Sequence, residues 1–154
     1  MSSRIEDLTP EARVIADRML SALDVQGVKY YVSEPLRTLE VQRAYYAQGR
    51  RNTLEVNSLR FIAGLAPIQA DGNKKTITEC DGDYRPSPHQ SGRAMDIYPV
   101  VQGKVRWKVA EENIGAWKIL GEAGELAGFV WGGRWKPLDK LGIGWDAPHF
   151  QVKT

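Results

Sequence analysis

Cysteine and histidine are scarce in this sequence of 154 residues, which contains one cysteine and two histidines. The lone Cys80 excludes an internal disulfide framework and any zinc site built only from cysteines. Long apolar runs are also missing, and none approaches the roughly 18 to 20 residues that span a bilayer. A chain of this length still buries about two thirds of its unfolded surface, so a stable core needs no covalent staples.

The excess of positive charge is small, because 21 Lys and Arg stand against 19 Asp and Glu, a net charge of +2. This balance argues against a dedicated binder of duplex DNA, and we expect no nucleic-acid partner. Weak encounters with an anionic polymer remain compatible with it. The polar start, Met1–Asp7, lacks the apolar core of a signal peptide, so we expect synthesis in the cytoplasm without a leader.

No repeat, low-complexity segment or flexible linker divides the chain, so we expect residues 1–154 to form a single domain and a monomer. Hydrophobic spacing and capping signals predict helices that begin after Thr9, Thr38 and Asn52, and one over Ile114–Ala127. Apolar and β-branched runs predict strands over Val28–Ser33, Arg93–Val101, Phe129–Trp131 and Phe150–Val152, and one near Thr76–Thr78. This order predicts an α+β fold, with a small antiparallel sheet packed with helices.

Both histidines have an aspartate nearby in the sequence. His89 precedes Asp96 by seven residues, and Asp146 precedes His149 by three. Two imidazoles and one carboxylate can hold zinc while leaving a position for water, and a second carboxylate can take a proton from that water. These short patterns also arise by chance, so on spacing alone the histidines are equally well explained as unrelated polar residues beside turns.

The two aspartates differ in their local setting. Asp96 lies in a predicted strand whose other face carries Met95 and Ile97, so its side chain is held rigidly, as a metal ligand requires. Asp146 lies in a bend, because Pro148 prevents a regular helix there. We therefore assign Asp96 to the metal and Asp146 to the base.

Four sequence blocks resemble the M15-type zinc peptidases, which include bacterial D,D-carboxypeptidases, D-alanyl-D-alanine dipeptidases and phage L-alanyl-D-glutamate endolysins. In chain order, the blocks are Ser33-x-x-x-Arg37-Thr38-x-x-x-Gln42 with Tyr46-Ala47-Gln48-Gly49-Arg50, Ser87-x-His89-x-x-Gly92-x-Ala94-x-Asp96, Trp131-Gly132-Gly133-x-Trp135, and Trp145-Asp146-x-Pro148-His149-Phe150. Together they span roughly residues 30 to 152, and four blocks in order are far more specific than any one of them.

The resemblance implies that His89, Asp96 and His149 bind zinc, that Asp146 is the catalytic base, and that the fold is the one shared with hedgehog signalling domains. It also implies that Arg37 steadies the oxyanion or a substrate carboxylate, for which a guanidinium is suited.

Two further positions, Gln42 and Ser87, match residues that contact substrate in relatives. The sequence leaves structural alternatives open: Arg37 can pair with Glu34 or Glu40, and Ser87 can serve a turn or support His89.

The resemblance implies a zinc-dependent peptidoglycan peptidase that hydrolyses the stem peptide, with the L-alanyl-D-glutamate bond as the expected target. With no leader expected, an endolysin-like role follows, in which a holin releases the enzyme to the cell wall during phage lysis. One alternative is a D,D-carboxypeptidase or D-Ala-D-Ala dipeptidase. Another is a zinc-containing binding module without turnover, against which the carboxylate at Asp146 argues.

The sequence departs from the compact family pattern in two segments, residues 51–83 and 136–144, and both are candidates to border a cleft. Trp131, Trp135 and Trp145 crowd the end of the chain, where core packing is the more frequent role of tryptophan and a cleft wall the alternative.

Overall fold

A computed structural model describes residues 5–33 and 37–154, which form two compact units. The helical unit contains residues 37–91. The sheet unit contains residues 5–33 and 92–154. In the described residues, no helix has both the length and the apolar character needed to cross a membrane.

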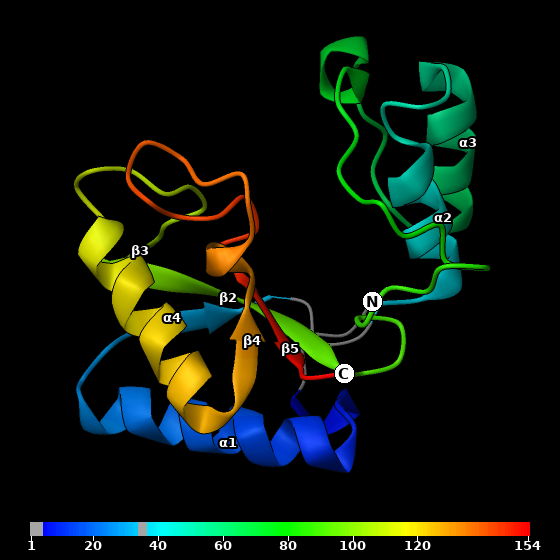
Figure 1. The fold of residues 1–154 in the computed structure, drawn as a ribbon. Helices are drawn as coiled ribbons and strands as arrows, with labels where there is room; N and C mark the ends of the chain where they lie inside the picture. The colour runs from blue at the N-terminus through cyan, green and yellow to red at the C-terminus, as the bar shows by residue number, and fades with distance from the viewer. Residues whose placement is uncertain (1–4, 34–36) are drawn as a thin grey trace. The chain divides into compact units, whose positions relative to one another are not determined.

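An antiparallel sheet forms the centre of the sheet unit (Figure 1). Its strands are ordered β1 (Tyr30–Val32), β2 (Ala94–Val101), β5 (His149–Val152) and β4 (Phe129–Trp131). The short β3 (Lys104–Val105) pairs with the end of β2. The predicted strands at these positions are confirmed, whereas β3 was not predicted.

Two helices pack against each other in the sheet unit, α1 (Pro10–Val25) and α4 (Ile114–Ala127). Thr9 caps α1, and its side-chain oxygen accepts a hydrogen bond from the backbone N–H of Ala12 at 3.2 Å. Gly128 ends α4 with a φ of 123°, a conformation that favours glycine. Short 3-10 turns lie at Ile5–Asp7 and Gly132–Arg134.

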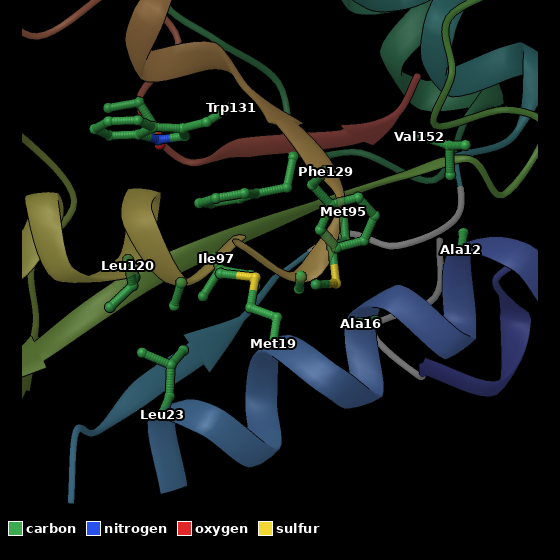
Figure 2. Packing of buried hydrophobic residues seen from close by; sticks show 14 of the residues in the cluster. Ala12, Ala16, Met19, Leu23, Met95, Ile97, Leu120, Phe129, Trp131 and Val152 are labelled. Carbon is green, nitrogen blue, oxygen red and sulfur yellow. The ribbon is translucent and has the colours of Figure 1, made fainter. Parts of the chain in front are cut away.

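Alternation along β2 and β5 separates a core face from a polar face. Met95 and Ile97 of β2 are fully buried in the cluster that α1 and α4 cover (Figure 2). Phe150 of β5 is fully buried in the same cluster. Asp96 lies between Met95 and Ile97 on β2, and His149 precedes Phe150 on β5. Both therefore project from the other face of the sheet. Met95 and Ile97 thus share the face opposite to Asp96, as predicted from the alternation of the strand.

The core requires glycine on the inner side of α4. A Cβ atom at Gly121 would collide with the ring of Trp131, and one at Gly124 would collide with the ring of Phe150. The two rings are stacked, with centroids 6.4 Å apart. Small residues on α4 thus let this aromatic pair lie directly against the helix.

The helical unit contains α2 (Leu39–Ala47), α3 (Thr53–Ile62) and a 3-10 turn at Ala70–Asn73. The predicted caps are confirmed: Thr38 Oγ1 accepts from the N–H of Val41, and Asn52 Oδ1 accepts from the N–H of Glu55.

The prediction of a strand near Thr76–Thr78 is wrong. Among residues 5–33 and 37–154 this segment has no strand partner, and side chains hold it instead. Gln42 Nε2 donates to Thr78 Oγ1, and Arg50 donates to the carbonyl of Thr78. The overall prediction of an α+β fold is nevertheless confirmed.

Replacing Gly124 by alanine should lower the free energy of unfolding by about 1 to 3 kcal/mol, because the new methyl group overpacks the Phe150 ring. The control is Gly115→Ala in the same helix, where a Cβ meets nothing within 4 Å, and this change should stabilise by up to about 1 kcal/mol. Urea denaturation measures both. Equal stability of the two variants would contradict the packing described for α4.

Candidate functional site

The pairing of β2 with β5 places Asp96 directly opposite His149. His149 Nδ1 lies 3.6 Å from Asp96 Oδ1, and the two side chains are 6% and 15% exposed. The imidazole and the carboxylate therefore meet on the polar face of the sheet in a largely dry environment.

Asp146 reaches the same imidazole from a turn. The backbone N–H of His149 donates to the carbonyl of Asp146 at 3.1 Å, which closes the turn that Pro148 keeps out of a regular helix. Asp146 Oδ2 lies 3.8 Å from His149 Nδ1, and the Asp146 side chain is 29% exposed. One nitrogen thus faces two carboxylates, of which only Asp146 is substantially open to solvent.

The other imidazole nitrogen has a partner that was not predicted from the sequence. His149 Nε2 lies 2.8 Å from Gln151 Oε1, two residues along β5 and on the same face of the strand. A proton on Nε2 is donated to this oxygen, which leaves Nδ1 as the nitrogen that can bind a metal. Because side chains alternate along a strand, the sequence could have indicated that Gln151 lies on the same face as His149.

The surroundings of His149 favour positive charge. Burial, the largest single influence, lowers the pKa of the imidazole, but the interactions with Asp96, Asp146 and Gln151 together raise it above its ordinary value. A metal ion that replaces the proton on Nδ1 meets the same two carboxylates. The donor chemistry of these residues therefore fits a divalent cation.

Close approach of two chain segments positions Asp146. A Cβ atom at Gly132 would collide with the carbonyl oxygen of Asp146, and the N–H of Gly144 donates to the carbonyl of Gly133 at 2.6 Å. Trp131 Nε1 also donates to the carbonyl of Ala147 at 2.7 Å. A Cβ atom at Gly133 would collide with the ring of Trp131, so the Trp131-Gly132-Gly133 motif needs glycine at both positions.

The three tryptophans near the end of the chain have different environments. Trp131 is buried in the core. Trp135 is partly buried, and its ring lies 5.1 Å from the ring of His149. Trp145 is 55% exposed. The predicted core role is therefore right for Trp131 and wrong for Trp145.

The helical unit brings together the candidate residues Arg37 and Gln42. Arg37 Nη1 donates to Gln42 Oε1 at 2.8 Å, and the guanidinium carbon lies 4.9 Å from the centre of the Tyr45 ring. Gln42 is fully buried, and its Nε2 donates to the carbonyl of Cys80 at 2.6 Å. Gln42 thus orients Arg37 from within the unit. Pairing of Arg37 with Glu34 lies outside the described residues.

Ser87 and His89 lie at the end of the helical unit, and both are buried. The Ser87 hydroxyl oxygen accepts a hydrogen bond from the backbone N–H of His89 at 3.3 Å, and the N–H of Arg37 donates to the carbonyl of His89 at 2.8 Å. Ser87 therefore stabilises the turn that holds the backbone of His89.

Residues 81–152 match a model of the M15 peptidases described as D-alanyl-D-alanine carboxypeptidase. The fold resembles the L-Ala D-Glu endopeptidase ChiX of Serratia marcescens at 20% identity and a TM-score of 0.54, over 97% of this chain and 83% of that one. It also resembles the LdcB LD-carboxypeptidase at 18% identity and a TM-score of 0.58, over 99% of this chain and 63% of that one.

A third similar structure is a mutant of the vancomycin-resistance D,D-pentapeptidase VanY in complex with Zn(II). It has 20% identity and a TM-score of 0.55, over 94% of this chain and 72% of that one. No curated protein has significant sequence similarity to the chain. The family model matches the part of the chain that carries the second, third and fourth sequence blocks, and the solved structures share the fold. Peptidases of this family are zinc enzymes.

Replacing Gln151 by leucine should weaken zinc binding by about 10- to 100-fold, because the imidazole loses the acceptor that orients it. Titration against a chelator of known affinity measures the change. Gln26→Leu, at the exposed end of α1, is the control and should bind zinc as the unchanged protein does. Unaltered affinity in the Gln151 variant would mean that this contact does not orient a ligand.

Proposed function

We propose that this protein is a zinc-dependent peptidase that hydrolyses the stem peptide of peptidoglycan at the L-alanyl-D-glutamate bond. The observation that carries the proposal is that the imidazole of His149 faces two carboxylates, Asp96 with 15% of its side chain exposed and Asp146 with 29% exposed. One carboxylate suited to hold a metal and one open to a reacting water are the requirements of a hydrolytic metal site.

His89, Asp96 and His149 are the proposed zinc ligands. The donor chemistry supports this set, because two imidazoles and one carboxylate hold zinc with a coordination position left for water. Backbone hydrogen bonds to Ser87 and Arg37 restrain His89, as a ligand requires. On this proposal the two units act together as one peptidase domain over residues 1–154.

Bound zinc would supply Lewis-acid polarisation of the scissile carbonyl and would acidify a water molecule. Asp146 is the proposed base that takes the proton of the attacking water and delivers it to the leaving amine. Its partial exposure gives access to water, and the turn at Pro148 together with Gly132 holds its backbone in place.

Arg37 is the proposed partner of the developing oxyanion or of a substrate carboxylate. Its charge is permanent, and the hydrogen bond to buried Gln42 fixes the orientation of its guanidinium. In this interpretation Gln42 influences substrate binding indirectly, by orienting Arg37. Ser87 also acts indirectly, by stabilising the turn that holds His89.

The choice of bond rests on the aspartate at the base position, which resembles the endolysin-like branch of the family, and on the similarity to the endopeptidase ChiX. An endolysin-like enzyme of this kind acts on the cell wall, with release through a holin as the proposed route. The description of the matching family model favours a second candidate, a D,D-carboxypeptidase that removes terminal D-alanine.

Mass spectrometry of muropeptides after digestion of purified peptidoglycan distinguishes the two candidates. New amino termini at glutamate that disappear with a chelator support the endopeptidase. Loss of one terminal alanine supports the carboxypeptidase. Unchanged muropeptides with zinc-loaded protein would overturn both, and would favour a zinc-containing binding module.

Replacing Asp146 by asparagine should lower turnover by about 10²- to 10⁴-fold with zinc retained, because the amide cannot accept the proton of water. Turnover is measured on purified peptidoglycan, and metal content by elemental analysis. Asp17→Asn, at an exposed position on α1, is the matched control and should retain turnover. An active Asp146 variant would remove the base assignment.

Replacing His89 by glutamine should lower zinc affinity by more than the ~10- to 100-fold that loss of an outer partner causes. Competition with a chelator measures the affinity, and circular dichroism confirms that the variant is folded. Ser91→Ala, at an exposed position two residues away, is the control. A folded His89 variant with full zinc content and affinity would show that the ligand set is wrong.

A further inference from the structure

A hollow of about 440 Å³ lies in the sheet unit beside the turn that carries Asp146. Its lining includes Trp107, Lys108, Pro137, Leu138, Asp139 and Trp145. The volume falls within the range of roughly 300 to 1,000 Å³ that is usual for small-molecule sites. Nothing in the proposed peptidase chemistry uses this hollow.

Two exposed tryptophans line the hollow. Trp107 is 58% exposed and Trp145 is 55% exposed, and Leu138 adds a further exposed apolar side chain. Clustered exposed aromatic surface of this kind marks an interaction site, because its contact with water is unfavourable.

Other aromatic rings hold both tryptophans in place. Trp107 packs edge-on against Tyr98 and Tyr31, with ring centroids at 4.8 and 5.8 Å, and Trp145 packs against Trp135 at 5.8 Å. Bracing of this kind reduces the conformational entropy that a side chain loses on binding. The two indoles are therefore preorganised to receive a ligand.

The lining of the hollow has little net charge. Among the described lining residues, Lys108 is a cation and Asp139 an anion. Asp139 Oδ1 already accepts hydrogen bonds from the N–H groups of Leu141 and Ile143. An acidic peptide would need a group of cations, whereas a neutral ligand with flat C–H faces and polar edges matches flat indoles with a polar rim.

We propose that this hollow binds an N-acetylated hexosamine ring of the peptidoglycan glycan strand, stacked on Trp107 and Trp145. The inference rests on the proposed function, because the sugar would belong to the polymer whose stem peptide is cut. Trp145 is adjacent in sequence to Asp146, and Ala147 and Pro148 of the lining precede His149. A glycan strand held here lies beside the segment that carries the base.

The segment 136–144 supplies one wall of the hollow through Pro137, Leu138 and Asp139. It is held as a tight turn, with a bridge between Leu138 and Gly144 and a hydrogen bond from the N–H of Asp139 to the carbonyl of Ile143 at 2.8 Å. This departure from the family pattern thus has a role in sugar binding.

Titration with chitotetraose and with glycan strands stripped of peptide tests the proposal, followed by intrinsic tryptophan fluorescence and calorimetry. Trp107→Ala should weaken binding of both probes by about tenfold. Trp107→Phe should restore part of the affinity, because it keeps a flat ring. Leu126→Ala, at an 87% exposed position on α4, is the control and should bind as the unchanged protein does.

The same variants separate this site from the peptidase site. Trp107→Ala should lower kcat/KM on intact peptidoglycan about tenfold and leave kcat/KM on a sugar-free stem peptide unchanged. Glycan binding that depends on Trp107 would support the sugar site even if no peptide bond were cut. Absence of glycan binding, equal binding by Trp107→Ala, or binding of stem peptide alone in the hollow would overturn it, even with full peptidase activity.

Discussion

The antiparallel pairing of β2 with β5 is the constraint on which the site depends. In this register Asp96 lies opposite His149, and Met95 lies opposite Phe150. A slip of one residue would bring the acidic side chain into the aromatic core and the apolar side chains into the site. Burial of the core face under α1 and α4 therefore fixes the polar groups on the other face, so stability and site geometry share one cause.

Rigidity around Asp146 comes from backbone packing. Gly132 approaches the carbonyl of Asp146, and Trp131 joins the core to the same turn through its bond to Ala147. A carboxylate in a turn would ordinarily be mobile, because loops make few contacts. Here the core aromatic residues hold the turn, so the partly exposed carboxylate lies on a fixed backbone.

Local signals in the sequence were sufficient to predict most of the elements. Capping by Thr9, Thr38 and Asn52 acts within one helical turn, and alternation along β2 shows which face carries Asp96. The strand expected near Thr76–Thr78 failed because side chains distant in sequence, Gln42 and Arg50, hold that segment.

Two features of the site escaped prediction, each for its own physical reason. The role of Gln151 depends on the tautomer of His149, which short sequence spacings do not reveal. The different environments of Trp131 and Trp145 follow from the pairing of β4 with β5, where Trp131 meets Phe150. Composition alone could not separate a core tryptophan from one that lines a hollow.

The central claim is a zinc centre with two imidazole nitrogens and a carboxylate. X-ray absorption at the zinc edge of the loaded protein tests it most directly. The account predicts two imidazole ligands at about 2.0 to 2.1 Å and otherwise only oxygen ligands, with one imidazole lost in a His149→Ala variant. A sulfur ligand at about 2.3 Å, or a spectrum unchanged by that substitution, would contradict it.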